Sequence, residues 1–420
     1  MILKDVEEKL REKIKDGFLY PDYNHYCISN IPATIFHIFG LKFEGKVLKE
    51  FLPGKDFEKV VLFLVDGFGY SEFLKHRNVG LLKRIVKKGV VVPITTVFPS
   101  STAPALTTLA TGLTPQQHGL IEWFMYMKEL DQIIKTLSFS PLRSDVQDEL
   151  SKILNPRILF RGASIHQKLR REGIKSLVFN FKRYVKSCYS SIAYKGSVPV
   201  SYITSSDLSV KLRKLVERED GYFYVHWPFV DWLKHYHGKN SEITEAETLL
   251  LFHQLRQHFF KKIDRKVARK TLFIMVSDHG LVDVDKREVV FLNKYSSILK
   301  NLKKSKKEGY HLVSGGSRSV FLHVRRGKVE ETKELLERKI QTDKKVVECE
   351  KAVKEGLFGK GRPTKKFLER VGDLLVLPKK SGVWYKYYKG FDIKFQSVHG
   401  GLTQEEMLVP LAMVRVSDVI

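Results

Sequence analysis

Three apolar runs in this chain each lead closely into an aspartate. The runs are VVLFLV before Asp66, FYVHW shortly before Asp231, and LFIMV shortly before Asp278. Runs of this kind, without alternating polar residues, are typical of strands that are buried on both faces of a parallel sheet. In open α/β sheets, ligands bind beyond the carboxyl ends of the strands. The sequence therefore predicts that the three aspartates lie at one binding edge.

Helical patterns separate these runs along the chain. We expect strands at 60–65, 90–96, 176–180, 222–226 and 272–276, and helices at 81–88, 164–172 and 241–264. This alternation predicts βαβ units and an α/β fold with a mostly parallel central sheet flanked by helices.

The pattern changes between residues 284 and 388. Basic loops there surround expected strands at 319–324, 345–348 and 373–377 and an expected helix at 329–340. We interpret this segment as an inserted α+β subdomain. The predicted organisation is an α/β core with an N-terminal helical extension over 1–283, a basic insertion over 284–390, and a return to the core over 391–420.

Composition narrows the class of protein. Apolar residues make up 43% of the chain and charged residues 29%, which is ordinary for a globular protein. No apolar run reaches the length of about 18 residues that a membrane-spanning helix needs, and the amphipathic N-terminal stretch does not resemble a signal peptide. The three cysteines are far apart and odd in number. We expect a cytoplasmic protein without a disulfide framework and without a membrane partner.

The net charge favours anionic partners. Lysine and arginine number 73 against 47 acidic residues, a formal charge of +26. Nucleic acid is one partner class that this charge suits, and a lysine-coated surface is the alternative interpretation. The densest basic stretches lie late in the chain and are interpreted as solvated loops: Lys303, Lys304, Lys306 and Lys307, then Lys360, Arg362, Lys365 and Lys366.

Histidines accompany the aspartates in a pattern that suits metal ions. Asp278 is followed directly by His279, and a last histidine, His399, lies in VHGG near the C-terminus. Asp231 and His235 are four residues apart, so on a helix both face the same side. With Asp66, these side chains give three carboxylates and three imidazoles, a set that suits two zinc-like ions. The alternatives are turn aspartates and an ordinary polar pair on a surface helix.

A hydroxyl cluster supplies nucleophile candidates. Ser100, Ser101 and Thr102 come before Pro104 and a small-residue helical pattern. A hydroxyl at a helix N-terminus has backbone N–H groups aimed at the phosphoryl oxygens of a group that it attacks, and a metal would lower its pKa. The alternative role is an N-cap. The chemistry of the three hydroxyls does not choose among them.

Five motifs, in order and spacing, resemble the alkaline phosphatase superfamily. They are DGFG, FPSSTAP with TGLTPQQHG, DWLKHYHG, SDHG and VHGG, and the branch they resemble is that of type I phosphodiesterases and nucleotide pyrophosphatases. The resemblance implies an alkaline-phosphatase-like three-layer sandwich and two divalent ions, zinc first and manganese as the alternative. It further implies one zinc bound by Asp231, His235 and His399. The other would be bound by Asp66, Asp278 and His279, with Thr102 as the nucleophile that becomes transiently phosphorylated.

Two positions depart from that branch. The branch has an asparagine shortly after the TGL…HG segment, where this chain has Glu122 and Trp123, and its FPN sequence is Ala103, Pro104 and Ala105 here. The expected function is a metal-dependent phosphodiesterase acting on a small anionic phosphate ester. Alternatives are a phosphomonoesterase or phosphonate hydrolase of the same superfamily, and a basic nucleic-acid-binding protein on a hydrolase scaffold.

Overall fold

A large mixed sheet forms the centre of the computed structural model, which describes residues 2–391 and 394–420. Its seven strands follow the order β4 (Val90–Thr95), β20 (Leu408–Arg415), β11 (Thr271–Val276), β3 (Lys59–Val65), β10 (Gly221–Trp227), β8 (Ser176–Phe181) and β9 (Val198–Tyr202). The pairs formed among β11, β3, β10, β8 and β9 are parallel, and β20 pairs antiparallel with both β11 and β4. The predicted mostly parallel sheet is confirmed.

Side chains of each central strand enter two separate hydrophobic cores. On β3, Val60, Leu62 and Leu64 lie in one core, whereas Val61 and Phe63 lie in the other. This alternation arises because successive side chains of a strand point to opposite faces. Both faces are therefore covered, and the predicted α/β sandwich of three layers is confirmed.

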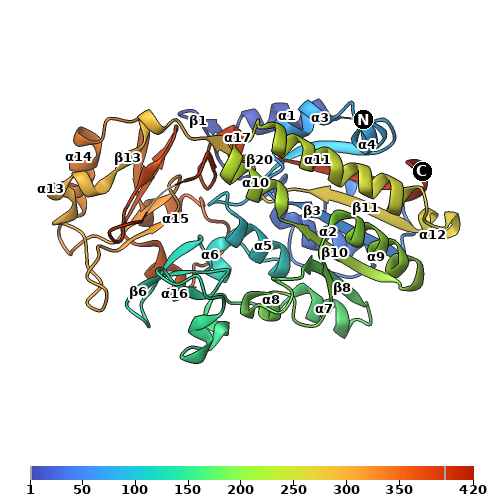
Figure 1. Ribbon diagram of the computed structural model, residues 1–420, viewed down its shortest axis with the longest axis horizontal. Helices are drawn as coiled ribbons and strands as arrows, with labels where there is room; N and C mark the ends of the chain where they lie inside the picture. The colour runs from blue at the N-terminus through green and yellow to red at the C-terminus, as the bar shows by residue number, and fades with distance from the viewer. Residues whose placement is uncertain (1, 392–393) are drawn as a thin grey trace.

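Different helices cover the two faces (Figure 1). One face packs against α2 (Ile31–Ile38), α5 (Thr102–Thr111), α7 (Ile165–Arg171) and α8 (Cys188–Ala193). The other packs against α3 (Tyr70–His76), α4 (Gly80–Lys88), α9 (Ser205–Arg218), α10 (Phe229–His237), α11 (Glu242–Leu255) and α12 (Arg265–Arg269). The helix expected over 241–264 is thus shorter, because the chain changes to a π-helix at Arg256–Phe260. The N-terminal helix α1 (Lys4–Arg11) is followed by a small hairpin of β1 (Ile14–Lys15) and β2 (Phe18–Leu19).

The later part of the chain has a third hydrophobic core. A four-stranded sheet in the order β14 (Val313–Gly315), β15 (Val320–Leu322), β17 (Leu374–Pro378) and β16 (Lys344–Glu348) packs with α13 (Ser296–Leu299) and α14 (Val329–Lys339). Figure 1 shows this region at the opposite end of the long axis from α4. Ile133 and Leu142 join the same core from the segment that holds β5 (Phe124–Met127), β6 (Gln132–Lys135) and β7 (Ser140–Pro141). The domain boundaries at 283 and 390 stay a prediction.

Several further short elements lie outside these two sheets. They are α6 (Pro115–His118), α15 (Cys349–Lys354), α16 (Lys365–Val371), α17 (Gln404–Met407) and the paired strands β12 (Val282–Asp283) with β19 (Ser397–Val398) and β13 (Val290–Phe291) with β18 (Val383–Trp384). Thr403 and Glu406 form a capping box at the start of α17. Among the described residues, no helix has the length and apolarity that crossing a membrane would require.

Candidate metal centre

The six predicted ligand residues come together as two groups of three. Their ligand atoms lie within 4.8 Å of one another in each group. The first, here called the buried group, comprises Asp66, Asp278 and His279. The second, here called the rim group, comprises Asp231, His235 and His399. The structure therefore divides the residues as the family resemblance implied.

Strand ends supply the buried group. Asp66 follows β3, and Asp278 and His279 follow the adjacent strand β11, so the parallel pairing brings their side chains to the same edge. The backbone N–H groups of Gly67 and His279 both donate to Oδ1 of Asp278, at 3.0 Å each. Asp278 and His279 are fully buried. Burial and the nearby Asp278 and Asp231 carboxylates raise the pKa of Asp66.

Helix α10 and the VHGG turn supply the rim group. Asp231 and His235 lie one helical turn apart, with Nε2 of His235 3.3 Å from Oδ2 of Asp231. His399 lies 4.0 Å from the other carboxylate oxygen of Asp231 and stacks on the ring of His279, with 3.7 Å between centroids. Although burial opposes it, the neighbouring His235 lowers the pKa of Asp231. The stacking of the two rings joins the two groups into one site.

A glycine allows α10 to approach the strand end. Gly67 has φ +70°, which favours glycine, and a Cβ added there would lie 2.8 Å from Cβ of Asp231. The glycine of the DGFG motif is therefore needed both for its turn and for the space that Asp231 occupies.

The three imidazoles all present the same nitrogen to the site. Their Nδ1 atoms lie against backbone carbonyls: His235 against Ser397 at 2.7 Å, His279 against Gly280 at 3.1 Å, and His399 against Ser100 at 3.2 Å. Each Nδ1 therefore carries the proton that donates to the carbonyl, and each Nε2 has a free lone pair.

These lone pairs face carboxylate oxygens, which suits bound cations. Nε2 of His279 lies 3.3 Å from Oδ2 of Asp278 and 3.5 Å from Oδ1 of Asp66. Among the described residues, Oδ2 of Asp278 and Oδ1 of Asp231 are buried without a hydrogen-bond partner. Buried polar atoms normally have partners, and a divalent ion in each group would satisfy these atoms and neutralise the carboxylates. The donor set therefore fits two metal ions.

Of the three candidate hydroxyls, Thr102 is the one that faces the ligands. Thr102 is the first residue of α5, and its Oγ1 lies 3.0 Å from Nε2 of His279 and 3.5 Å from Oδ1 of Asp66. Ser100 instead donates to the carbonyl of Gly401 at 2.6 Å, and Ser101 donates to Oε1 of Glu122 at 2.8 Å. Geometry thus distinguishes hydroxyls that the sequence left equivalent.

Two basic side chains near the ligands were not singled out from the sequence. Nε2 of His226, at the end of β10, lies 2.9 Å from Oδ2 of Asp66. Lys234 is buried and donates to the carbonyl of Gly67 at 2.7 Å and to the carboxylate of Glu72. Burial lowers the pKa of Lys234 to about 7. The available signals were a histidine inside an apolar strand and a lysine that shares a helix face with Asp231.

His118 makes structural contacts between two helices. Its Nε2 lies 3.2 Å from Oγ1 of Thr108, and its Nδ1 accepts from the backbone N–H of Leu120 at 3.1 Å. These contacts tie α6 to α5, the helix that begins at Thr102.

An arginine between β14 and β15 supports the rim group. Arg318 is fully buried and forms two hydrogen bonds of 2.9 Å with the carboxylate of Glu406. The same carboxylate accepts from the N–H of Gly401 at 2.9 Å, two residues after His399. The bidentate pair therefore holds the VHGG turn against the loop between β14 and β15.

Glu122 occupies the region where the related branch has an asparagine. It is buried between Ser101, Gly316 and Gly400, and its Oε2 has no hydrogen-bond partner among the described residues. Burial raises the pKa of Glu122 to about 7.

Comparison with known proteins gives a consistent result. The family model described as type I phosphodiesterase/nucleotide pyrophosphatase matches residues 60–402. Human ectonucleotide pyrophosphatase/phosphodiesterase family member 1 is 28% identical over 255 residues, which are 58% of this chain. Those residues cover 26% of that protein, so the chain matches about a quarter of its length.

Solved structures show the same fold. Murine ectonucleotide pyrophosphatase/phosphodiesterase 5 superposes with a TM-score of 0.63 at 21% identity, covering 84% of this chain and 87% of the other. An inactive variant of that murine protein, in complex with AMP, has the same TM-score at 20% identity and covers 85% and 87%. The human counterpart has a TM-score of 0.61 at 17% identity, again covering 85% and 87%. Because the family model spans most of the chain, this protein belongs to the type I phosphodiesterase and nucleotide pyrophosphatase family.

Proposed function

We propose that this protein hydrolyses phosphate diesters at a site that holds two divalent metal ions, with Thr102 as the nucleophile. The observation that carries the proposal is the position of the Thr102 hydroxyl, 3.0 Å from Nε2 of His279 and beside two complete ligand groups. Family membership supports the reaction class, since the family is named for diester and pyrophosphate cleavage.

The buried and rim groups would each hold one ion. The mixture of imidazole and carboxylate donors suits zinc, and manganese is the alternative. Bound there, the two ions would supply Lewis-acid stabilisation of charge on the attacking and leaving oxygens. The residues of the chain orient this chemistry. Carbonyl contacts at Nδ1 fix the ligand nitrogens of His235, His279 and His399, and the N-terminus of α5 aims backbone N–H groups at the phosphoryl oxygens.

The proposed reaction has two steps. Oγ1 of Thr102 attacks phosphorus, the bond from phosphorus to the leaving alcohol oxygen breaks, and the alcohol departs with a proton. Water then attacks the phospho-threonine, the bond to Oγ1 breaks, and a phosphate monoester leaves while the threonine regains its hydroxyl proton. Splitting one displacement into two in this way is the general benefit of a covalent nucleophile.

The proposed substrate is a phosphate diester that carries a nucleotide. A structural relative has been solved in complex with AMP, which is the monoester that such a diester would release. Glu122 and Trp123 replace the asparagine of the related branch, so the contact to the phosphoryl oxygen is expected to differ here.

The test uses two chromogenic substrates. With zinc or manganese added, bis-(p-nitrophenyl) phosphate should be cleaved in preference to p-nitrophenyl phosphate, and Thr102→Ala should remove turnover while metal content stays near two ions per chain. Ser101→Ala is the matched control, since its hydroxyl faces Glu122 rather than the ligands. Preference for the monoester would instead indicate a phosphomonoesterase, and metal binding without turnover on either ester would contradict the hydrolase proposal.

A further inference from the structure

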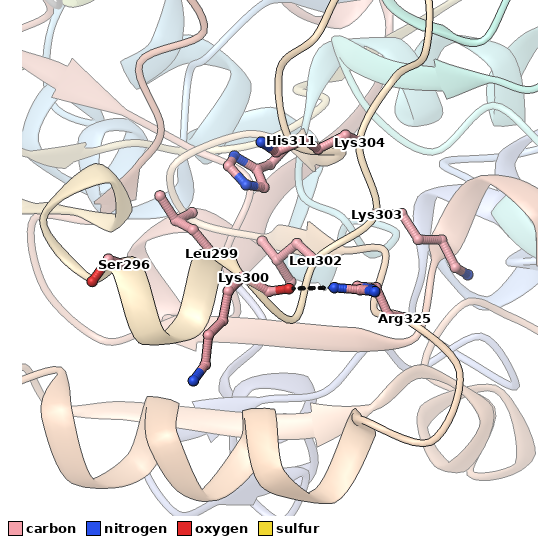
Figure 2. Close-up of a pocket in the computed structure, with 8 residues that line it drawn as sticks. All are labelled: Ser296, Leu299, Lys300, Leu302, Lys303, Lys304, His311 and Arg325. Carbon is pink, nitrogen blue, oxygen red and sulfur yellow. Dashed lines mark hydrogen bonds between the residues drawn. The ribbon is translucent and has the colours of Figure 1, made fainter.

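A recess in the inserted segment is lined by cationic side chains. It has a volume of about 770 Å³, and its lining includes Lys300, Lys303, Lys304 and Arg325 around Leu299 and Leu302. Figure 2 shows the two leucines between the cationic side chains, with Arg325 donating to the backbone carbonyl of Lys300. Two of the lysines belong to a basic stretch that the sequence alone assigned to solvated loops.

Most of this charge has no carboxylate partner. No aspartate or glutamate lines the recess. Lys303 pairs with Asp373 at 3.3 Å, whereas Lys300, Lys304 and Arg325 form no ion pair within 4.0 Å among the described residues. On the adjacent helix α14, by contrast, Lys333 pairs with Glu330 at 3.8 Å and with Glu348 at 3.7 Å. Three of the four cationic side chains of the recess therefore form no ion pair among the described residues, so the recess attracts anions, and low-dielectric walls strengthen this attraction.

The arrangement suits an extended polyanion with apolar groups. The cations surround the leucines instead of converging on one point, so a single compact phosphate would contact only some of them (Figure 2). A single-stranded nucleic acid presents successive phosphates along its backbone and exposes bases that can contact an apolar surface. A duplex could bring its phosphates to the edge of the recess, but its bases would stay stacked inside the double helix.

We propose that this recess binds single-stranded nucleic acid through its phosphodiester backbone. Lys300, Lys304 and Arg325 contact phosphates, and Leu299, which is partly exposed above the buried Leu302, contacts a base. The recess lies in the third hydrophobic core region, away from α5 and α10, which bear residues of the metal centre (Figure 1). The proposal goes beyond the diesterase function and does not depend on it, because binding requires no turnover.

The experiment measures binding of a fluorescently labelled oligothymidylate by anisotropy across a salt series. The full-length Thr102→Ala protein is used so that the oligonucleotide is not cut. Binding should weaken at least about tenfold in Lys300→Glu/Lys304→Glu, and the slope of log K against log salt should fall by about 1.4, from about 0.7 for each lost phosphate contact in a single strand.

A matched charge reversal separates the recess from generic attraction. Lys83 and Lys87 are exposed on α4, at the other end of the molecule, and Lys83→Glu/Lys87→Glu changes net charge by the same amount. This control should keep most of the affinity and nearly all of the slope. Equal weakening by both pairs, or no binding by the parent protein, would overturn the proposal. Displacement by inorganic tripolyphosphate at the same phosphate concentration would also overturn it, in favour of a compact anion.

Two further measurements keep the result interpretable. If the Glu variant does not fold, Lys300→Gln/Lys304→Gln takes its place. This variant removes the two positive charges without adding negative ones, so it should weaken binding by a smaller factor. Cleavage of bis-(p-nitrophenyl) phosphate by Lys300→Glu/Lys304→Glu with Thr102 present should equal that of the parent. If the diesterase proposal were wrong, neither protein would cleave bis-(p-nitrophenyl) phosphate, but oligonucleotide binding would be unaffected.

Discussion

The two ligand groups are built in different ways. The buried group lies on strand ends in the middle of the sheet, and backbone N–H groups of Gly67 and His279 fix Asp278 from two sides. The rim group joins a helix to a turn from the far end of the chain, and His235 and His399 are only partly buried. The sheet therefore makes the first group a rigid part of the core, whereas the second depends on how α10 and the VHGG turn are held together.

Charge differs between the two groups as well. In the buried group, burial raises the pKa values of both Asp66 and Asp278, and the Asp231 carboxylate adds to the effect on each. In the rim group the neighbouring His235 lowers the pKa of Asp231 despite burial. The buried group has two carboxylates and one imidazole, whereas the rim group has one carboxylate and two imidazoles, so a divalent ion in the buried group would contact one more carboxylate. We expect the buried group to bind a divalent ion more tightly.

Loss of either group should have the largest effect on activity. Asp278→Asn in the buried group and His399→Ala in the rim group are each expected to lower diester turnover at least about a thousandfold, about 4 kcal/mol of barrier, because both ions act on the same displacement. Metal analysis of the purified variants should give one ion per chain in each. A His399→Ala protein that retained two ions and normal turnover would contradict the division into two groups.

Metal removal should reveal the order of affinity. Stepwise chelation is expected to remove the rim ion first with a small change in melting temperature, and the buried ion second with a larger one. At a free metal concentration about 1,000 times Kd, an ion adds about 4 kcal/mol to the free energy of unfolding. Calorimetry on protein with two, one and no ions measures both steps. Simultaneous loss of the two ions at one chelator concentration would show that the groups bind as a single unit.

Near the rim group, the buried carboxyl of Glu122 should destabilise the fold when it is ionised. Burial raises the pKa of Glu122 to about 7 from the ordinary value of 4.5, so between these pH values the folded protein retains a proton that the unfolded chain has released. The stabilisation is fully present below about pH 4.5 and is lost as pH rises to about 7, with a magnitude of about 3 kcal/mol.

Glu122→Gln should therefore unfold at nearly the same denaturant concentration as the parent at pH 5, and be more stable than the parent at pH 8. Urea unfolding at the two pH values gives the difference directly, and the comparison of variant with parent cancels other titrating groups. An equal difference at both pH values would show that the carboxyl of Glu122 does not titrate in this range.

The sequence predicted the parts of this site that depend on local pattern. Continuous apolar runs are typical of buried parallel strands, so Asp66 and Asp278 could be placed at one sheet edge. The spacing of Asp231 and His235 fixed their shared helix face. Local sequence pattern could not predict contacts between residues that are far apart in the chain. The hydrogen bond between His226 and Asp66 joins a residue on β10 to the turn after β3, and nothing near either residue in sequence predicts it.

The same limit applies to the hydroxyls and the basic stretches. Ser100, Ser101 and Thr102 are chemically similar neighbours, and their directions depend on Gly401, Glu122 and His279, which lie elsewhere in the chain. The strand Leu374–Pro378 could be expected from its apolar run, but its antiparallel partners could not. The helices and strands could be predicted from periodicity. The contacts between them became known only from the tertiary structure.

The smallest effect is expected from His226, which supports the buried group without being a ligand. Its Nε2 lies 2.9 Å from Oδ2 of Asp66, and partners of this kind typically contribute a factor of about 10 to 100 in metal affinity. His226→Leu should weaken binding of one ion by that factor and leave the rim ion unchanged, as measured by competition with a chromogenic chelator.

His166→Leu is the matched control for that measurement. His166 is also a buried histidine, but it lies 3.1 Å from Ser176 and stacks on Tyr222, with no contact to a ligand. Its replacement should cost stability without changing the affinity of either ion. His226→Leu could instead weaken the affinity of both ions equally. In that case the stacked rings of His279 and His399 would couple the two groups, and the structural difference between the buried group and the rim group would not extend to metal binding.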